Sequence, residues 1–329
     1  MTKLTIYKLR FTAPLHLGDE RADYDKSLSV YHSDSLYAAI TAVLAKVGVP
    51  VPDDGDWGFT VSSLFPYYQK GENDEPVYFL PKIKKQDDFD PEIRKKVKKI
   101  AWLDLDYFNH YIAGKALFSG GVKDEHFKKS YLTSQNIDEN FISSGVNPRV
   151  TVSRTGKEDA RPFYMERLYF SHNSGMYFIA VGDKLETLAT ALSMLKDEGI
   201  GTDRTVGNGF FEWEKAEIGL DLPASDYAAN LSMFIPESKE QLGQMLNAEH
   251  VAYDFQKRGG WITDGGLNTF RKNSIYMFNE GSVFKSGQQT LHLKGRLADL
   301  KPALDYAHLG ITPHPIWRNG KALFIPVKI

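Results

Sequence analysis

Apolar and polar residues alternate one by one over residues 5–11, a pattern typical of a strand with one buried face. After a polar stretch, apolar residues recur every three to four positions over 36–47, which indicates a helix with one buried face. We expect Ser33 to cap this helix, and Gly48 and Pro50 to end it. The chain therefore opens as strand, loop and helix.

A similar succession returns after a long irregular stretch. A second amphipathic helix is predicted over residues 183–197, with Asp183 and Glu186 at capping-box spacing and Gly199 at its end. Strands are predicted at residues 149–154, 163–170, 176–181 and 210–218, with a turn at 173–175 joining the second and third. With about 51–148 set aside as an insertion, residues 1–222 read β-α-β-β-α-β, the ferredoxin-like unit.

Residues 223–329 suggest a second, less regular cycle of the same kind. A helix is predicted over residues 240–246. Strands are predicted at residues 231–236, 251–255, 274–278, 291–297 and 322–327. The predicted fold class is therefore α+β, with two tandem ferredoxin-like (RRM-like) domains and a large insertion in the first.

The composition fits an ordinary globular protein, at 42% hydrophobic and 25% charged residues over 329 positions. No apolar run approaches the roughly 20 residues that cross a bilayer, and the chain has no cysteine. We expect a cytoplasmic protein without a signal peptide, a membrane contact, disulfides or thiolate metal sites. The net charge of −2 argues against a wholly basic nucleic-acid binder. Local basic strips remain compatible with it, because salt screens charges beyond about 8 Å.

Four glycines in eleven residues mark the segment 199–209, between the predicted helix and strand. Glycines leave backbone amides accessible to an anion, and Arg204 at the centre adds a positive charge for phosphate. A dinucleotide fingerprint needs strand before helix, and a P-loop needs Gly-Lys-Ser/Thr, so neither fits. The alternative is a turn whose glycines serve geometry alone.

A second candidate is the pair of segments 258–261 and 270–272, which combine glycines, Trp261 and cations. Such a mixture suits single-stranded RNA, because cations meet phosphates while a flat ring stacks a base. The alternative is a solvated hairpin with a buried Trp. Further cations are Arg149, Arg154, Lys82, Lys84, Lys85 and the run at 94–99. Their charge fits a contact with RNA and a solvated surface equally well.

The nine histidines show no helical His-x-x-x-His spacing, and no Gly-x-Ser-x-Gly motif occurs. The succession at 32–34 resembles a catalytic trio only on paper, because neighbouring residues at a helix start cannot converge on one atom. We keep His16 as an RNA contact. The sequence thus predicts no catalytic site, no metal and no cofactor.

Several blocks in one order resemble the RAMP superfamily of CRISPR-associated proteins, and within it the fourth subunit of type III-A (Csm) effector complexes. The blocks lie at residues 11–18, 32–36, 78–82, 147–154, 199–209, 260–262, 271–272, 280–284 and 314–327. Ser153 stands where that family often has Asp, and Ile83 where it often has Pro.

The resemblance implies a non-catalytic subunit that holds the 5′ handle of the CRISPR RNA between two ferredoxin-like domains. Its implied neighbours are the large polymerase/cyclase subunit and the backbone RAMP subunit, and an inserted hairpin within 79–148 is expected to act as a thumb that kinks the guide. The predicted RNA contacts are His16, Gly18, Lys82, Lys84, Arg149, Arg154, Gly199, Gly201, Arg204, Thr205, Gly207, Gly209, Arg258, Trp261, Arg271 and Lys272.

Two other functions stay open at this point. One is a RAMP-type, metal-independent endoribonuclease that processes CRISPR precursor RNA, with His16 or His32 as general base. The other is a structural scaffold whose glycine loop contacts protein.

Overall fold

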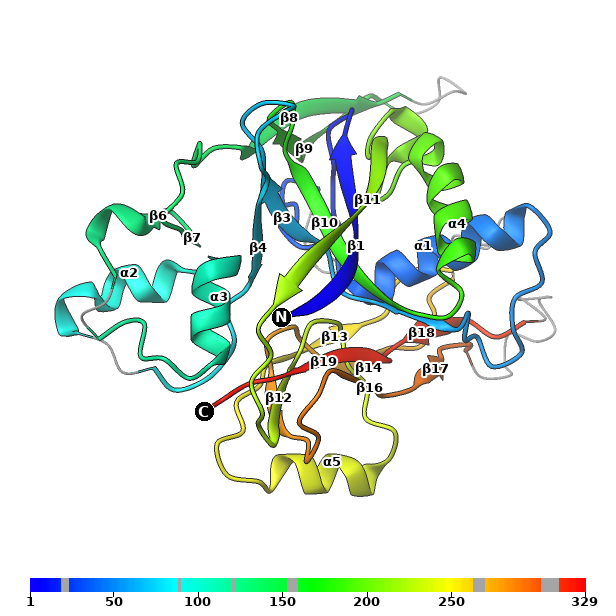
Figure 1. The fold of residues 1–329 in the computed structure, drawn as a ribbon. Coiled ribbons are helices and arrows are strands. Elements are labelled where there is room, and N and C mark those ends of the chain that lie inside the picture. The colour runs from blue at the N-terminus through cyan, green and yellow to red at the C-terminus, as the bar shows by residue number, and fades with distance from the viewer. Residues whose placement is uncertain (19–23, 88–89, 120–121, 153–158, 263–269, 303–313) are drawn as a thin grey trace.

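The computed structural model describes residues 1–329 except 19–23, 88–89, 120–121, 153–158, 263–269 and 303–313. Arg154, one of the predicted RNA contacts, lies outside the described residues. The fold is α+β, with one large sheet, one small sheet and three two-stranded ribbons among the described residues. Figure 1 shows the large sheet above the small one, with the N-terminus near mid-height and the C-terminus lower down.

Strand β1 (Thr2–Phe11) is the centre of the first half. It pairs antiparallel with β10 (Gly175–Gly182) on one side and β11 (Phe211–Leu220) on the other, and β3 (Phe65–Tyr68) pairs with β10. Tyr7 and Leu9 belong to the core beneath α1 (Ser33–Lys46) and α4 (Leu185–Glu198), whereas Leu4 and Ile6 belong to the core on the other face. The alternation along β1 thus serves two cores, as period two requires.

Two short strands correct the predicted insertion at 51–148. β2 (Phe59–Val61) and β3 both pair with β10, so they are part of the first-half sheet. All seven of their residues are buried. A strand that is covered on both faces shows no alternation, and three or four residues are too few to reveal a period.

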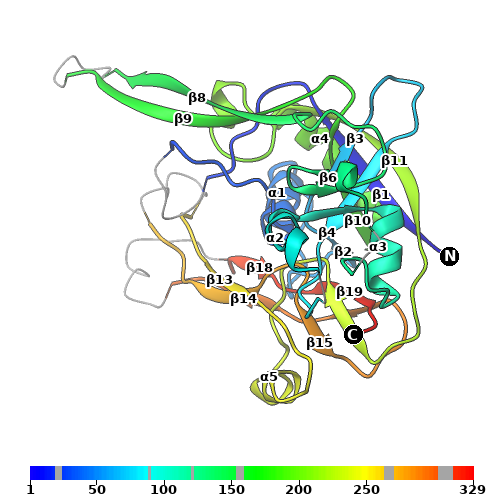
Figure 2. The ribbon, with the colours of Figure 1, turned by 90° about the vertical axis from the view of Figure 1, so that its left-hand side faces the viewer.

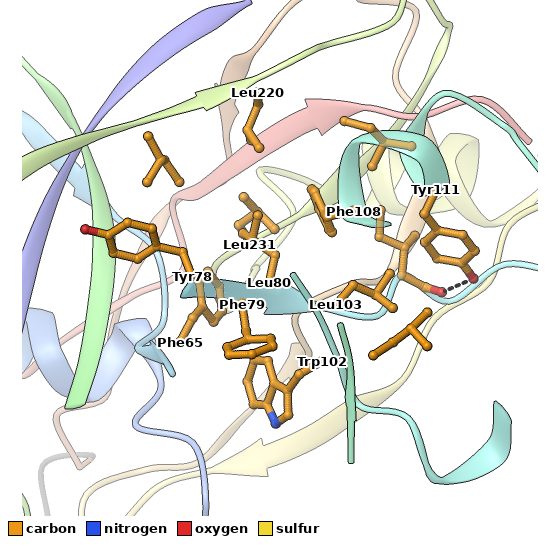
Figure 3. Close-up of a cluster of buried hydrophobic side chains, with 14 of the residues drawn as sticks. Phe65, Tyr78, Phe79, Leu80, Trp102, Leu103, Phe108, Tyr111, Leu220 and Leu231 are labelled. Atoms are coloured by element: carbon orange, nitrogen blue, oxygen red, sulfur yellow. Dashed lines mark hydrogen bonds between the residues drawn. The ribbon is translucent and has the colours of Figure 1, made fainter. Parts of the chain in front are cut away.

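The remainder of that stretch forms a lobe that extends the large sheet. Its elements are β4 (Val77–Pro81), α2 (Arg94–Lys99), β5 (Trp102–Asp104), α3 (Leu105–Ile112), β6 (Phe127–Lys128), β7 (Tyr131–Leu132) and the 3-10 turns Pro91–Ile93 and Asp124–His126. Figure 3 shows Phe79, Leu80 and Leu103 packed beside Phe108 and Tyr111 of α3. The same core reaches Leu231 of the second half, so the lobe joins the two halves.

A long hairpin projects from the body (Figure 2). It consists of β8 (Ile142–Thr151) and β9 (Arg161–Phe170), paired over ten positions. β9 and β10 follow one another through a short turn, as predicted, and the pairing partner of β9 is β8. The long hairpin also lies at 142–170 rather than within 79–148, where the thumb was expected.

Helix ends follow the sequence signals only in part. α1 ends before Gly48, and Gly199 after α4 has a φ of 76°, both as expected. The residue before α1 is His32, and Ser33 instead accepts a hydrogen bond from the Met233 amide at 2.9 Å. The residue before α4 is Lys184, without a side-chain cap, so the Asp183 capping box does not form.

The second half holds a sheet in the order β15-β12-β19-β16, from β12 (Tyr227–Asn230), β15 (Val283–Lys285), β16 (His292–Lys294) and β19 (Ala322–Pro326). The helix α5 (Lys239–Leu246) lies beside it, near its predicted place. Two ribbons complete this half: β13 (Phe255–Arg258) with β14 (Ile275–Phe278), and β17 (Leu297–Asp299) with β18 (Trp317–Asn319).

Two predicted strands of this half are displaced. β12 ends before residues 231–236, and β13 begins only at Phe255 rather than spanning 251–255. Residues 231–235 are all buried, and the Ser232 hydroxyl donates to the Val61 carbonyl of the first half at 2.8 Å. This segment runs between the two halves, and a run that is buried on every side carries no period to locate its bounds.

Candidate nucleic-acid interface

The glycine loop at 199–209 packs on the segment that follows β1. The Gly209 amide donates to the Pro14 carbonyl at 2.7 Å, and the Thr202 amide donates to the His16 carbonyl at 2.9 Å. A Cβ on Gly201 would lie 2.5 Å from the His16 carbonyl oxygen. Glycine is therefore required for the close approach of the two backbones.

Three of the four glycines serve the geometry of the loop. Gly199 and Gly209 have φ near 76°, and a Cβ on either would meet a backbone oxygen across the loop at 2.6 Å or less. Gly207 has φ +85° and nothing within 4 Å of an added Cβ. Because the amides of Gly199, Thr202 and Gly209 bond within the protein, the expectation of a loop of bare amides is corrected. The part that faces outward is the 3-10 turn Arg204–Val206.

Arg204 is the accessible charge of this loop. Its side chain is 42% exposed, and the Glu198 carboxylate lies 3.9 Å away, longer than a strong ion pair. Burial raises the pKa of the Tyr31 hydroxyl to about 12, against the opposing effects of the Arg204 charge and the Gly201 amide. Arg258 acts on the same hydroxyl from the other half. The loop and β13 therefore meet around Tyr31.

Arg258 itself is an internal joint. Its guanidinium bonds both oxygens of Asp34, at 2.9 and 3.2 Å, and the Ser35 hydroxyl at 2.8 Å. Arg318 reaches the same carboxylate at 2.6 Å, and Asp34 is fully buried. Burial alone would raise the pKa of Asp34, but the two guanidiniums hold it well below its usual range. Because Arg258 is paired with Asp34, it joins the two halves of the protein. It does not form an open phosphate site.

A second buried pair lies beside the first. The His32 Nδ1 is 2.9 Å from Glu280 Oε1, and Glu280 also accepts a hydrogen bond from Ser63. Burial would raise the pKa of Glu280, but the His32 charge and these hydrogen bonds hold it below its usual range. His16 is buried too, and its Nδ1 donates to the Glu166 carbonyl at 2.6 Å. The His16 side chain therefore joins the segment after β1 to strand β9.

A cavity of about 430 Å³ opens where β4 and β5 meet the second half. Three lysines line it, and each has an acceptor: Lys82 pairs with Asp87 at 2.9 Å, Lys84 donates to the Glu280 carbonyl at 3.3 Å, and Lys85 donates to the Tyr111 carbonyl at 2.9 Å. Burial lowers the pKa of Lys84 and of Lys85, because a cation is poorly solvated there. The structure thus brings the predicted Lys82 and Lys84 together in one recess.

The segment at residues 30–32 connects the cavity with the loop. Val30 and His32 line the cavity, and Tyr31 between them is near enough to Arg204 for the positive charge to lower the pKa of its hydroxyl against the larger effect of burial. A line of polar groups therefore runs from the outward turn of the loop to the lysine cavity. Sequence reasoning missed Tyr31 and Gln256 on this line, and no local motif marks them. Glu280 lies in the block 280–284, but no role was predicted for it.

The tip of the β13–β14 ribbon carries a stacked pair. Trp261 is 50% exposed, and the Arg271 guanidinium lies 4.6 Å above its ring, so the alternative of a buried Trp is wrong. The Lys272 amide donates to the Gly260 carbonyl at 3.0 Å. The rest of the exposed indole is available for stacking with a base.

Arg149 lies on the hairpin, where its guanidinium contacts the Met165 sulfur at 3.8 Å. Figure 2 shows the β8–β9 hairpin, the segment after β1 and the ribbon β13–β14 reaching toward the same side. The described part of the chain holds no cluster of three or more metal-ligating side chains and no helix long and apolar enough to cross a membrane.

Comparison with known proteins gives this geometry a family. Residues 224–327 match the family model described as the CRISPR Csm4 C-terminal domain. A Csm4 protein of Thermococcus onnurineus is 29% identical over 72% of this chain and 74% of its own length. A Csm4 protein of Streptococcus thermophilus is 25% identical over 93% of both chains. The chain is similar to Csm4 proteins along most of its length.

Solved structures agree on the fold along the full length of the Csm4-like chain. A chain of a Csm3-Csm4 subcomplex in the type III-A CRISPR-Cas interference complex superposes with a TM-score of 0.61 at 19% identity, covering 100% of both chains. A chain of a Csm1-Csm4 cassette in complex with cA4 gives 0.60 at 20% identity, covering 100% of this chain and 99% of the other. At such identities the likeness concerns the fold.

Proposed function

We propose that this Csm4-like chain is a non-catalytic RNA-binding subunit of a type III-A CRISPR interference complex. It anchors the 5′ handle of the CRISPR RNA and bridges the large polymerase/cyclase subunit to the backbone RAMP subunits. Similar chains have been solved in a Csm1-Csm4 cassette and in a Csm3-Csm4 subcomplex, which supports one neighbour of each kind.

One observation carries the RNA part of the proposal, namely the line of polar groups from Arg204 through Tyr31 to the lysine cavity. The phosphates of an unpaired strand need cations at intervals, and its bases need flat or apolar surfaces between them. Arg204 and Lys84 supply the first, and Trp261, half exposed at the ribbon tip, supplies the second. Arg149 and Arg271 add cations on the same side of the molecule.

The alternative function, an endoribonuclease, would need His16 or His32 as its general base, and the setting of both histidines argues against it. A general base must reach the proton that it abstracts. His16 is only 1% exposed and its Nδ1 donates to a carbonyl, while the Nδ1 of His32 is held by Glu280. Both side chains are engaged in supporting the fold.

The two-domain division at 222/223 is part of the proposal. A family model that begins at residue 224 supports the boundary. In the first domain the order β11-β1-β10-β3, with α1 and α4, is that of a β-α-β-β-α-β unit. The order β15-β12-β19-β16 of the second domain departs from that unit. The strand order therefore supports a ferredoxin-like unit in the first domain but not in the second.

A binding titration of the full chain tests the proposal. We expect handle RNA to bind more tightly than an unrelated strand of equal length, and the chain to co-purify with its large and backbone neighbours. The labelled repeat RNA should stay intact in the absence of metal. Equal affinity for both RNAs would contradict the anchoring role, and a defined cut would favour the endoribonuclease.

A further inference from the structure

The outer face of the β13–β14 ribbon carries aromatic rings in solvent. Phe255 is 52% exposed and Tyr276 is 62% exposed. Lys257 lies directly across from Tyr276 in the register of the two strands, so it shares their face. Tyr253, at 44% exposure, extends the same group toward the small sheet.

These rings are held in place from behind. The inner face of the ribbon packs through Met277, which is fully buried, and through Gln256, which bonds His32. The rings of Phe255 and Tyr276 meet edge to face, with centroids 5.6 Å apart. Their arrangement therefore does not depend on an added partner, and more than half of each side chain is in solvent. Aromatic side chains gathered on a surface in this way mark a binding site.

The charge of the ribbon favours a polyanion as the occupant. Residues 255–278 contain four cations and one carboxylate, Asp264. Lys257 and Arg271 are exposed, whereas Arg258 is taken up by Asp34. Asp254, just before the ribbon, accepts a hydrogen bond from the Asn279 side-chain amide. At the far end the Trp261–Arg271 stack continues the same pairing of ring and cation.

We infer that this face is a stacking platform for unpaired RNA bases, with Phe255 and Tyr276 as the rings and Lys257 as the phosphate contact. The inference rests on the proposed function, because it supplies a second place where the same RNA is held. Neighbouring antiparallel strands that present rings and a cation on one face suit successive bases and the phosphate between them. A protein neighbour would be expected to bring carboxylates to Lys257, and it forms the alternative outcome of the test.

The test uses the full chain with oligoadenylate and oligouridylate of equal length. In the double variant Phe255→Ala/Tyr276→Ala, we expect affinity for oligoadenylate to fall by about 5- to 100-fold per stacked base, with the salt dependence unchanged. The wild type should prefer oligoadenylate to oligouridylate, because adenine has the larger ring. This preference should shrink in the double variant. Lys257→Ala should instead lower the slope of log affinity against log salt by about 0.7.

The control is Phe255→Tyr/Tyr276→Phe, which keeps both rings and should bind as the wild type does. Melting temperatures of all variants show whether the chain remains folded. Unchanged RNA affinity in the alanine variant overturns the inference, whether or not assembly with protein neighbours is lost. If the wild type binds neither homopolymer, the stacking platform is overturned, whereas the proposed function is decided separately by the titration with handle RNA.

Discussion

Arg318 Nη1 lies 2.6 Å from the Oδ2 of Asp34, although 284 positions separate the two residues. Asp34 is in the first turn of α1, and Arg318 is on β18, close to the end of the chain. Arg258 completes the group from β13, so one carboxylate joins three distant elements. The segments that carry the candidate interface depend on this joint, because it sets β13 and the segment at 30–32 side by side.

Removal of the carboxylate should destabilise the protein strongly. In Asp34→Asn the two guanidiniums of Arg258 and Arg318 would stay buried without a counter-charge, which costs about 3–5 kcal/mol of unfolding free energy. Urea unfolding measures the loss. Glu198→Gln is the matched control, since its pair with Lys46 is on the surface and should contribute no more than about 1 kcal/mol. Similar losses in both variants would contradict the role of the joint.

The same carboxylate should make stability depend on acid. The pKa of Asp34 is depressed in the folded state, as is that of Glu280, so each binds fewer protons folded than unfolded. Their contributions are present above the ordinary carboxyl pKa values of about 4 and are lost as the pH falls below them. Urea midpoints should thus be steady from about pH 7 to 5 and then drop. In Asp34→Asn the drop should be shallower, and an identical profile would speak against it.

The amphipathic elements could be predicted from the sequence, and the buried ones could not. α1 and α4 each show a period because one face meets a core and the other does not. β1 was expected to bury one face, but Leu4 and Ile6 serve one core and Tyr7 and Leu9 the other. β2 and β3 are covered on both faces, so their residues carry no alternation.

The candidate interface shows a similar division. Arg204 and Trp261 are accessible, as expected, because loops with glycine and charge tend to lie at the surface. Arg258 looked equally available in the sequence. Its partner Asp34 lies 224 positions away, and only the fold brings the two together.

Arg204 should contribute one phosphate contact. Its replacement in Arg204→Ala is expected to weaken handle binding and to lower the slope of log affinity against log salt by about 0.7, the value for one contact with a single strand. Filter binding over a series of salt concentrations measures both. Arg296→Ala removes an equally exposed guanidinium from the second half, and its slope should match that of the wild type. An unaltered slope in Arg204→Ala would exclude the contact.

Substitutions at two glycines of the 199–209 loop test its internal packing and its outward face separately. In Gly209→Ala the new methyl group would lie 1.9 Å from the Ile200 carbonyl oxygen, at a φ of +76°. The backbone must then move, and with it the bond from the Gly209 amide to Pro14 that holds the loop on the segment after β1. In Gly207→Ala the methyl group has open space, so the cost is the left-handed conformation alone, about 1–2 kcal/mol.

We therefore expect Gly209→Ala to lose clearly more unfolding free energy than Gly207→Ala, and to lose handle affinity along with it. Gly207→Ala should keep Arg204 in place and bind RNA nearly as well as the wild type. Urea unfolding and filter binding on the same preparations measure the two effects. The opposite result would be that Gly207→Ala loses more RNA affinity than Gly209→Ala while remaining the more stable variant. The outward turn would then touch the RNA backbone at Gly207 itself. In that case the close packing on Pro14 would not be what positions Arg204.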